Sequence, residues 1–562
     1  MRGISLEADG QPDKSAPRAA RFPSAGAVVN SALVDTDTYD VIIIGGSLAG
    51  SATATLLLRE HPHLRVCIAE RAPSFTRRVG EATVEISGYF LGRVLGLSHH
   101  LNEAHLVKQG MRFWFANAET QTLADASEIG PQYHVRLPSW QLDRSVVDEK
   151  SLEQAVDLGA ELRRPAQVRE ATLAAGGEQV VRVTEAGAEK LLRGRWIVDA
   201  SGVAALLARQ EGWFQANTAH PTAAAWARWR GVKDWDGRTL GTKFPDWSAR
   251  CVGSRNTATN HIVGDGWWSW WIPLKGGDVS VGVVFDQRLV RFPQGEAKLG
   301  DRIRDFLSGH PVAAELLAEA EWVEGDVHWR KNLAYTSRQF AGDGFALVGD
   351  AAAFLDPLYS PGLDGVAFTV TATTQLIAAH FRGEPVEEAL AQHNARFTRS
   401  YARWFEAVYK DKYEYIGDYE LMGLGFYMDL GLYYLGVVSQ PFKFGEKALA
   451  LPPFIDKESV PVFHLMRSYN RRLARMAQVR RERGVFGRAN SNHHFLVPSF
   501  SLDRSDVPRI VKAAARWLLL EVKEGWRSWF RDGESGAVNE ARPGATTLAA
   551  AEQTLPQATP SV

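Results

Sequence analysis

Cysteine, long apolar runs and an excess of charge of either sign are all scarce in this sequence. The chain has 562 residues but only two cysteines, Cys67 and Cys251, which excludes a disulfide framework and predicts reduced thiols in a cytoplasmic protein. No run approaches the roughly 18 apolar residues of a membrane span, and no apolar signal segment is evident. The formal net charge of −1 gives no reason to expect nucleic acid.

Tryptophan, in contrast, is abundant, with 18 copies that suggest aromatic-lined cavities. Residues 1–37 and 532–562 are rich in small and polar residues and are predicted to be disordered tails. The body between them mixes strand and helix patterns up to about residue 385 and is mostly helical afterwards. Within it, residues 261–286 are predicted to form two strands joined by the turn "KGGD" at 275–278. The stretch 466–484 carries seven arginines and is predicted to be a solvated helix face, with nucleic-acid or membrane contact as a minor alternative.

The first pattern with chemical content is a strand, a glycine turn and a helix near residue 45. The turn contains Gly45, Ser47 and Gly50 in a G-x-G-x-x-G spacing, with serine replacing the middle glycine and Leu48 and Ala49 opening the helix. Free amides at such a helix start favour a pyrophosphate. Glu70, followed by Arg71, ends the next strand, where its carboxylate can accept hydrogen bonds from a ribose diol. The pattern alone does not separate FAD from NAD.

Three later segments complete a pattern that resembles the p-hydroxybenzoate-hydroxylase-like FAD flavoproteins. They are Arg144 in "LDRSVVDEKSL", "DASG" at 199–202, and Gly349-Asp350 followed by Ser360-Pro361-Gly362. The resemblance implies an α/β fold with a discontinuous Rossmann-like FAD domain at 38–400. It also implies a mixed-sheet substrate domain inserted at about 100–135 and 215–335 and a mainly helical C-terminal region at 401–531. Asp350 is then expected near the ribityl and pyrophosphate groups.

More specific motifs resemble the flavin-dependent halogenases. "WSWWIP" at 268–273 matches that family's W-x-W-x-I-P signature, and Phe354, Pro357, Ser360 and Gly362 fit its F-x-x-P-x-x-S-x-G signature, with Leu363 following. "VGEAT" at 79–83 and "VKQGMRF" at 107–113 are similar to two further family segments. The second of these segments makes Lys108 the counterpart of the family's essential lysine.

The resemblance implies that reduced FAD, oxygen and a bound chloride or bromide make hypohalous acid. Halide and flavin ring are expected to meet at the Ser360 turn, and Lys108 is expected to pass the halogen to an aromatic substrate, phenolic or another aryl. Trp268 and Trp270 then form a rigid wall that keeps the substrate off the flavin. A separate NAD(P)H flavin reductase is the implied partner, the substrate is either free or carrier-protein-tethered, and no metal site is expected. The implied setting is secondary metabolism, such as antibiotic or pigment biosynthesis.

Two departures from the family pattern keep alternatives open. Tyr359 stands where tryptophan halogenases carry a glutamate, which argues against tryptophan as the substrate. Pro361 removes an N–H that a halide could use. The alternatives are an FAD-dependent monooxygenase built on the same scaffold and a non-catalytic flavin-binding protein. The aromatic stretch 413–438 either lines a pocket for an apolar substrate or forms the core of a helical subdomain.

Overall fold

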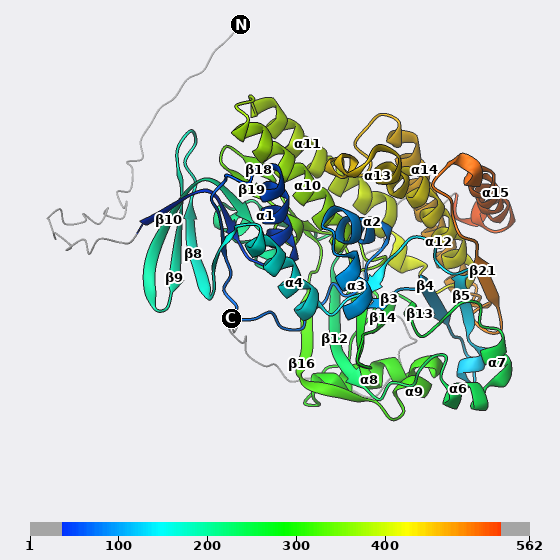
Figure 1. The fold of residues 1–562 in the computed structure, drawn as a ribbon. Coiled ribbons are helices and arrows are strands. Elements are labelled where there is room, and N and C mark those ends of the chain that lie inside the picture. Colours follow the sequence, from blue (N-terminus) through cyan, green and yellow to red (C-terminus); the bar gives the residue numbers. More distant parts are fainter. Residues whose placement is uncertain (1–35, 530–562) are drawn as a thin grey trace, which may run out of the picture. The chain divides into compact units, whose positions relative to one another are not determined.

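The computed structural model describes residues 36–529, so the predicted tails at 1–37 and 532–562 lie outside these residues except for Thr36 and Asp37. These two residues begin strand β1 (Thr36–Ile44), ahead of position 38, where the sequence placed the start of the folded body. Figure 1 shows two sheets with helices packed on their faces. The predicted α/β class, with a mixed second sheet and a helical C-terminal region, is confirmed.

The first sheet is mainly parallel and holds the strands predicted around the glycine turns. Its order is β18-β19-β10-β1-β2-β7, with the hairpin β8–β9 added to β10. β1 reads "TDTYDVIII", a β-branched run that becomes fully buried toward its end, as expected for a strand covered on both faces. The other bounds are β2 (Val66–Ala69), β7 (Glu161–Arg163), β8 (Ala166–Thr172), β9 (Gln179–Glu185), β10 (Ala188–Asp199), β18 (Ala341–Gly342) and β19 (Phe345–Leu347).

Helices with small and apolar buried faces pack on this sheet. In Figure 1 α1 and α4 lie side by side, and α10 and α11 lie together at the top of the view. The core of this part joins β1 and β10 to α1 and α10. The helices are α1 (Leu48–Glu60), α2 (Glu85–Tyr89) continued by the π-helix η1 (Phe90–Val94), α3 (Ser98–Ala104), α4 (Arg144–Asp157), α5 (Leu206–Gln210), α10 (Gly362–Phe381) and α11 (Glu387–Trp404).

The second sheet has the order β16-β12-β15-β14-β13-β4-β5-β21. Its strands are β4 (Met111–Phe115), β5 (Ser127–Pro131), β12 (Thr222–Arg230), β13 (Thr259–Gly264), β14 (Trp267–Pro273), β15 (Val279–Asp286), β16 (Glu321–Lys331) and β21 (His494–Val497). The sequence predicts two strands across 261–286, but a turn at Asp265–Gly266 makes them three. β21 comes from the region predicted to be mainly helical and pairs in parallel with β5.

Different layers cover the two faces of the second sheet. One face packs on α6 (Arg238–Lys243), α7 (Pro245–Ala249), α8 (Leu299–Ser308) and α9 (Pro311–Leu317), which run beneath the sheet in Figure 1. The other face packs on the C-terminal helices. Those are α12 (Tyr419–Tyr433) with the π-helix η7 (Tyr434–Val438), α13 (Ser439–Phe444), α14 (Ser459–Glu482) and α15 (Val507–Lys523). The remaining strands are β3 (Leu106–Val107), β6 (Trp140–Gln141), β11 (Phe214–Ala216), β17 (Tyr335–Ser337) and β20 (Ala353–Phe354).

Two expectations about the C-terminal region change in the structure. The arginines of α14 are only partly solvated, because Arg472 pairs with Glu521 at 2.7 Å and buried Arg480 pairs with Asp418 at 2.8 Å, whereas Arg471 is exposed. Among the described residues, the stretch Tyr419–Phe444 is long and apolar enough to cross a membrane by length and composition. Over half of its most apolar window is buried inside the protein, as in the core helix of a soluble protein.

Candidate active site

Strand register brings four turns that are distant in sequence to one edge of the first sheet. Ile44 lies opposite both Ala69 and Asp199, and Asp199 lies opposite Leu347. The residues that follow these strand ends are Gly45, Glu70, Ala200 and Val348. Ligands of parallel α/β sheets bind outside the carboxyl ends of the strands, so this edge is the expected nucleotide site.

The first turn is fixed by side chains from β2 and α4. Gly46 donates its N–H to Glu70 at 2.8 Å, which closes the turn against the end of β2. The hydroxyl of Ser47 donates to Asp148 at 2.8 Å, and the Arg144 guanidinium donates to the same carboxylate at 3.0 Å. Leu48 and Ala49 then begin α1, whose first amides have no partner within the helix. The free amides at the start of α1 therefore present partial positive charge to an incoming phosphate, and Asp148 holds the Arg144 guanidinium beside them.

Gly50 and Gly349 allow the first glycine turn and the Gly349-Asp350 segment to approach each other. A Cβ at Gly50 would lie 1.9 Å from the carbonyl oxygen of Gly45, so only glycine lets α1 start this close to its strand. Gly349 lies against Ala49 of α1 and donates its N–H to Thr369 at 2.8 Å. The half-buried Asp350 carboxylate accepts no hydrogen bond from the described residues. It is therefore available to hydroxyl groups of a bound ligand, whereas Arg71 is exposed beyond Glu70.

The turn before α10 holds two non-glycine residues in the left-handed region. Tyr359 has φ +67° and Ser360 has φ +58°, and Ser360 donates its N–H to the Pro357 carbonyl at 3.0 Å. Pro361 is the N-cap residue of α10, so its missing N–H lies outside the helix. The amides of Gly362 and Leu363 in the first turn remain without helical partners. This helix end can therefore still attract a halide, although Pro361 itself provides no N–H donor.

The tryptophans of "WSWWIP" divide between the two faces of β14. Trp268, Trp270 and Ile272 face the core shared with the C-terminal helices, while Trp271 faces α6 to α9. Trp268 donates its indole N–H to Tyr413 at 2.8 Å, and Trp270 donates to Ser280 at 3.1 Å. Both rings are buried and tied at their polar edge. They have the rigidity that a barrier requires, and Leu358 and Tyr359 of the turn belong to the same cluster.

Lys108 lies inside the protein rather than on its surface. Only 2% of the residue is exposed, and its amine donates to the carbonyl oxygen of Thr83 at 2.8 Å. Burial lowers the pKa of this amine to about 8, although the charges of Glu85 and Asp364 oppose the shift. The amine is thus held near the point where it exchanges a proton at ordinary pH.

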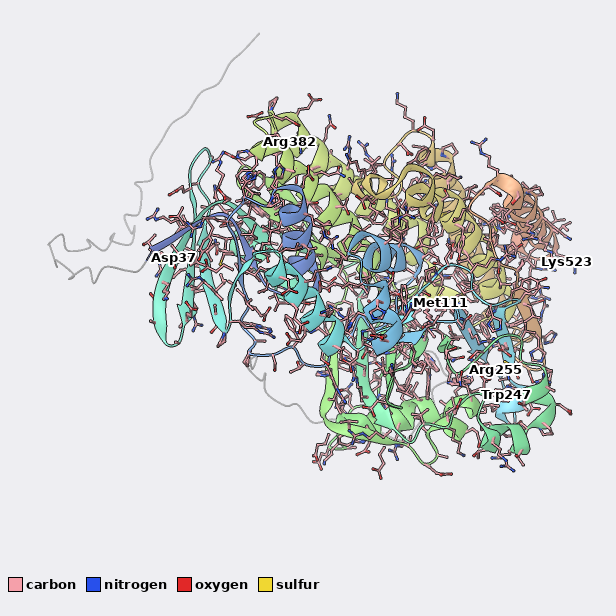
Figure 2. All side chains as sticks on the ribbon, viewed as in Figure 1. Asp37, Met111, Trp247, Arg255, Arg382 and Lys523 are labelled. Carbon is pink, nitrogen blue, oxygen red and sulfur yellow. The ribbon has the colours of Figure 1, made fainter. Side chains whose placement is uncertain are left out.

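A cavity of about 650 Å³ opens next to these groups. Its inner wall includes Val84 and Glu85, which follow the carbonyl that holds Lys108, and Met111, which is labelled in Figure 2 at the start of β4. Tyr359 and Pro361 of the turn line it as well. Most of the rest comes from the C-terminal region, which therefore lines a pocket besides contributing to a core. Pro361 also borders a smaller cavity formed with Gly349 and Gly362, so it stands between the two spaces.

Sequence motifs missed several polar groups around this cavity. Glu85, Asp364, Tyr433 and Tyr434 come from segments outside the motif positions, and only the fold brings them together. His261 was also missed. It is buried, it lies 5.3 Å from the Trp268 ring, and burial next to Lys108 lowers its pKa to about 3. Within residues 36–529, no three His, Cys, Asp or Glu side chains gather in a way that could hold a metal ion.

A sequence profile described as tryptophan halogenase matches residues 40–136 and 118–410, most of the described chain. This chain belongs to the tryptophan halogenase family. The enzyme is therefore an FAD-dependent oxidoreductase, and the residues at the sheet edge fit that cofactor. They are a helix start, the Arg144 guanidinium and the Asp350 carboxylate, which has no hydrogen-bond partner among residues 36–529. The resemblance given by the W-x-W-x-I-P and F-x-x-P-x-x-S-x-G motifs is confirmed.

Individual relatives of the enzyme are similar at modest identity. The flavin-dependent halogenase chlA of Dictyostelium discoideum is 28% identical over 371 residues, which is 60% of each chain. The sulochrin halogenase gedL of Aspergillus terreus is 26% identical, and the alignment covers 66% of this chain and 68% of gedL. Among solved structures, halogenase PltM in complex with phloroglucinol and FAD has a TM-score of 0.65 at 20% identity, covering 87% of this chain and 96% of PltM. That likeness shows the shared fold.

Proposed function

We propose that the enzyme halogenates an aromatic substrate, with Lys108 delivering the halogen from the flavin side to the cavity. The observation that carries this proposal is a buried lysine with a pKa of about 8, held by the Thr83 carbonyl just before the cavity-lining residues Val84 and Glu85. His261, on which the Lys108 charge acts, lies 5.3 Å from the Trp268 ring. A neutral amine can bind or accept an electrophilic halogen, whereas an exposed, permanently charged lysine cannot.

The chain's own residues divide the work around the cofactor. Bound reduced FAD supplies the two electrons that, with oxygen and chloride or bromide, give hypohalous acid. The residues that hold the nucleotide are Gly45, Ser47, Gly50, Arg144 and Asp350. The residues that support the same site are Leu48, Ala49, Glu70, Arg71, Gly349, Pro357 and Leu363. The α10 amides next to Ser360 and Gly362 attract the halide. Trp268 and Trp270 exclude the organic substrate and admit only a small oxidant.

The cavity supports an aromatic substrate of a phenolic kind. Its volume of about 650 Å³ falls in the range that holds whole drug-sized ligands. Tyr359 occupies the place of the glutamate that assists tryptophan halogenation, and a phenol is already activated by its own oxygen. PltM was solved in complex with phloroglucinol, a phenol, which favours this substrate class.

We also infer the surroundings in which the enzyme works. A separate NAD(P)H flavin reductase supplies reduced FAD, and the substrate arrives as a free molecule or tethered to a carrier protein. The unpaired thiols of Cys67 and Cys251 are in keeping with a cytoplasmic location. The product belongs to secondary metabolism, such as antibiotic or pigment biosynthesis.

The test is reconstitution with a flavin reductase, NADH, FAD, oxygen and bromide. Wild-type enzyme is expected to brominate both monochlorodimedone, which traps free oxidant, and a phenol in the cavity. Lys108→Met is expected to lose phenol bromination while still consuming reduced FAD. Lys298→Met is the matched control, because the Lys298 side chain is 66% exposed. Bromination that survives Lys108→Met removes the assigned role, and hydroxylated product with no brominated trap indicates a monooxygenase.

A further inference from the structure

The wall of the cavity next to Lys108 carries two carboxylates, Glu85 and Asp364. They are far apart in the sequence. Glu85 begins α2, two residues after Thr83, and Asp364 lies in the first turn of α10, just after Ser360. Both carboxylates act electrostatically on Lys108. The place where halogen would emerge therefore has acidic groups on the substrate side.

Two tyrosines of the C-terminal region hold these carboxylates in place. Tyr433 donates its hydroxyl to Asp364 at 2.9 Å, and Tyr434 donates to Glu85 at 2.6 Å. The other oxygen of Asp364 accepts the backbone N–H of Ser87 at 3.0 Å. Each carboxylate oxygen has a second lone pair, so these contacts leave capacity for a substrate hydroxyl.

We propose that Glu85 and Asp364 together form the proton acceptor for a phenol bound in this cavity, with Tyr433 as a positioning residue. The inference deepens the proposed halogenation and rests on it. It gives the enzyme a base on the cavity wall where Tyr359 has replaced the acidic residue of the tryptophan-specific relatives.

The charges around the pair suit proton exchange near neutral pH. Burial and the neighbouring Glu85 raise the pKa of Asp364 to about 7, against the hydrogen bonds from Tyr433 and Ser87. The titratable groups facing Asp364 are Lys108 beyond Thr83, Glu85 on α2, Tyr433 on α12 and Tyr409. A base works best when its pKa is close to the working pH, so that it is ionised and still accepts a proton readily.

The chemical step balances without another reactant. The phenol O–H bond breaks and its proton goes to the carboxylate pair, which makes the ring electron-rich. A ring carbon attacks the halogen of hypohalous acid held at Lys108, so the carbon–halogen bond forms as the halogen–oxygen bond breaks. The departing hydroxide takes the proton held by the carboxylate pair and leaves as water. The ring carbon then gives its own proton to the freed carboxylates, which restores aromaticity, and that proton returns to the phenolate oxygen. The products are one halophenol and one water.

The rest of the wall indicates what else the phenol carries. Beyond the two carboxylates the cavity extends along the C-terminal region and is mainly apolar, with Leu430, Val437, Leu451, Phe454, Val462 and Met466 among its lining residues. A single ring would leave most of about 650 Å³ unfilled. The fitting substrate class is therefore a phenol with a large apolar substituent, whose hydroxyl lies at Glu85 and Asp364.

The first experiment compares rates for two phenols with the same alkyl chain para to the hydroxyl. One is otherwise unsubstituted, and the other carries two meta fluorines, which make it more acidic and leave both ortho carbons open to halogenation. Glu85→Gln and Asp364→Asn are expected to lower kcat for the ordinary phenol about 100-fold, the lower end for a missing general base. The loss should shrink to a few-fold for the acidic phenol, which ionises unaided. Glu103→Gln, at an exposed glutamate, is the control. Tyr433→Phe should show a smaller loss of the same kind, while misfolding would slow both substrates equally.

The second experiment needs no halogenation, so it separates this inference from the proposed function. Binding of the alkyl phenol and of its methyl ether to the oxidised holoenzyme is measured by calorimetry. Wild-type enzyme should prefer the phenol about tenfold, and both carboxylate variants should lose that preference. An equal loss of rate for both phenols together with an unchanged phenol preference overturns the proposal. If no brominated monochlorodimedone forms with the wild-type enzyme but the enzyme still prefers the phenol to its methyl ether, only the proposed halogenation is rejected.

Discussion

Lys108 destabilises the folded enzyme at neutral pH, because burial lowers the pKa of its amine. Its pKa falls from 10.5 to about 8, and each unit corresponds to about 1.4 kcal/mol. Folding a charged Lys108 therefore costs about 3 kcal/mol at pH 7. Replacing it with Met removes this cost but leaves the Thr83 carbonyl without its donor, which costs about 1–2 kcal/mol. We expect Lys108→Met to raise the free energy of unfolding by about 1–2 kcal/mol at pH 7.

The sign of the pH dependence follows from proton linkage. Below pH 8 Lys108 is protonated in both states and the full cost is present. Between pH 8 and 10.5 the unfolded state binds more protons than the folded state, so wild-type stability gains from rising pH relative to the variant. With these two pKa values, the advantage of Lys108→Met should fall by about 2 kcal/mol between pH 7 and pH 9.5.

The assay is urea unfolding of wild type and Lys108→Met at matched FAD saturation across this pH range, followed by far-ultraviolet circular dichroism. Taking the difference between the two proteins cancels the titration of all groups that they share. A stability difference that stays constant from pH 7 to pH 9.5 would mean that Lys108 keeps an ordinary pKa. The argument for a neutral, halogen-accepting amine would then fail with it.

Three further predictions concern the Trp270 indole, the glycine turn at Gly50 and the buried ion pair of Lys412 and Asp429. A Cβ at Gly282 would lie 2.2 Å from the Trp270 ring, so Gly282→Ala should displace that indole, lower the melting temperature and raise hydroxylated by-products seen by mass spectrometry. Gly50→Ala should abolish FAD retention on gel filtration, because the new methyl group meets the Gly45 carbonyl. Asp429→Ala leaves buried Lys412 without its 2.6 Å partner and should cost about 3–5 kcal/mol in chemical unfolding, whereas Lys412→Met combined with Asp429→Leu should cost much less.

The nucleotide side of the fold could be predicted from sequence because its signals are local. Gly45, Gly50 and Glu70 lie within one strand–turn–helix–strand unit, and the alternation in β14 directs Trp268 and Trp270 to one face. The turn at Asp265–Gly266 was missed because apolar residues run on both sides of it. β21 was missed because four residues in a helical region carry little periodic signal.

On the substrate side the sequence offered only the alternative that 413–438 lines a pocket, which the structure bears out. The polar groups that meet there could not be predicted, because they meet only through long-range contacts. Glu85 and Tyr434 are hydrogen-bonded although 349 positions separate them, and Ser87 and Asp364 are 277 positions apart. No spacing rule links such positions. The motif that contains Ser360 ends at Gly362, two residues before Asp364, so nothing in the sequence distinguishes this acidic residue from an ordinary charge in the first turn of a helix.

A second buried lysine shows why Lys108 is the better candidate for halogen transfer. Lys412 is fully buried beneath the cavity, and its amine donates to Asp429 at 2.6 Å, to Tyr415 at 2.5 Å and to Asn470 at 2.9 Å. Burial lowers the pKa of Lys412 too, but the contacting Asp429 carboxylate opposes that shift. All three protons of the amine are engaged, so it cannot present a lone pair. Lys108 has one carbonyl partner, and the two nearby carboxylates act on it over a longer distance. Burial without a contacting counter-charge is what distinguishes an amine that can lose its proton from one that only stabilises the fold.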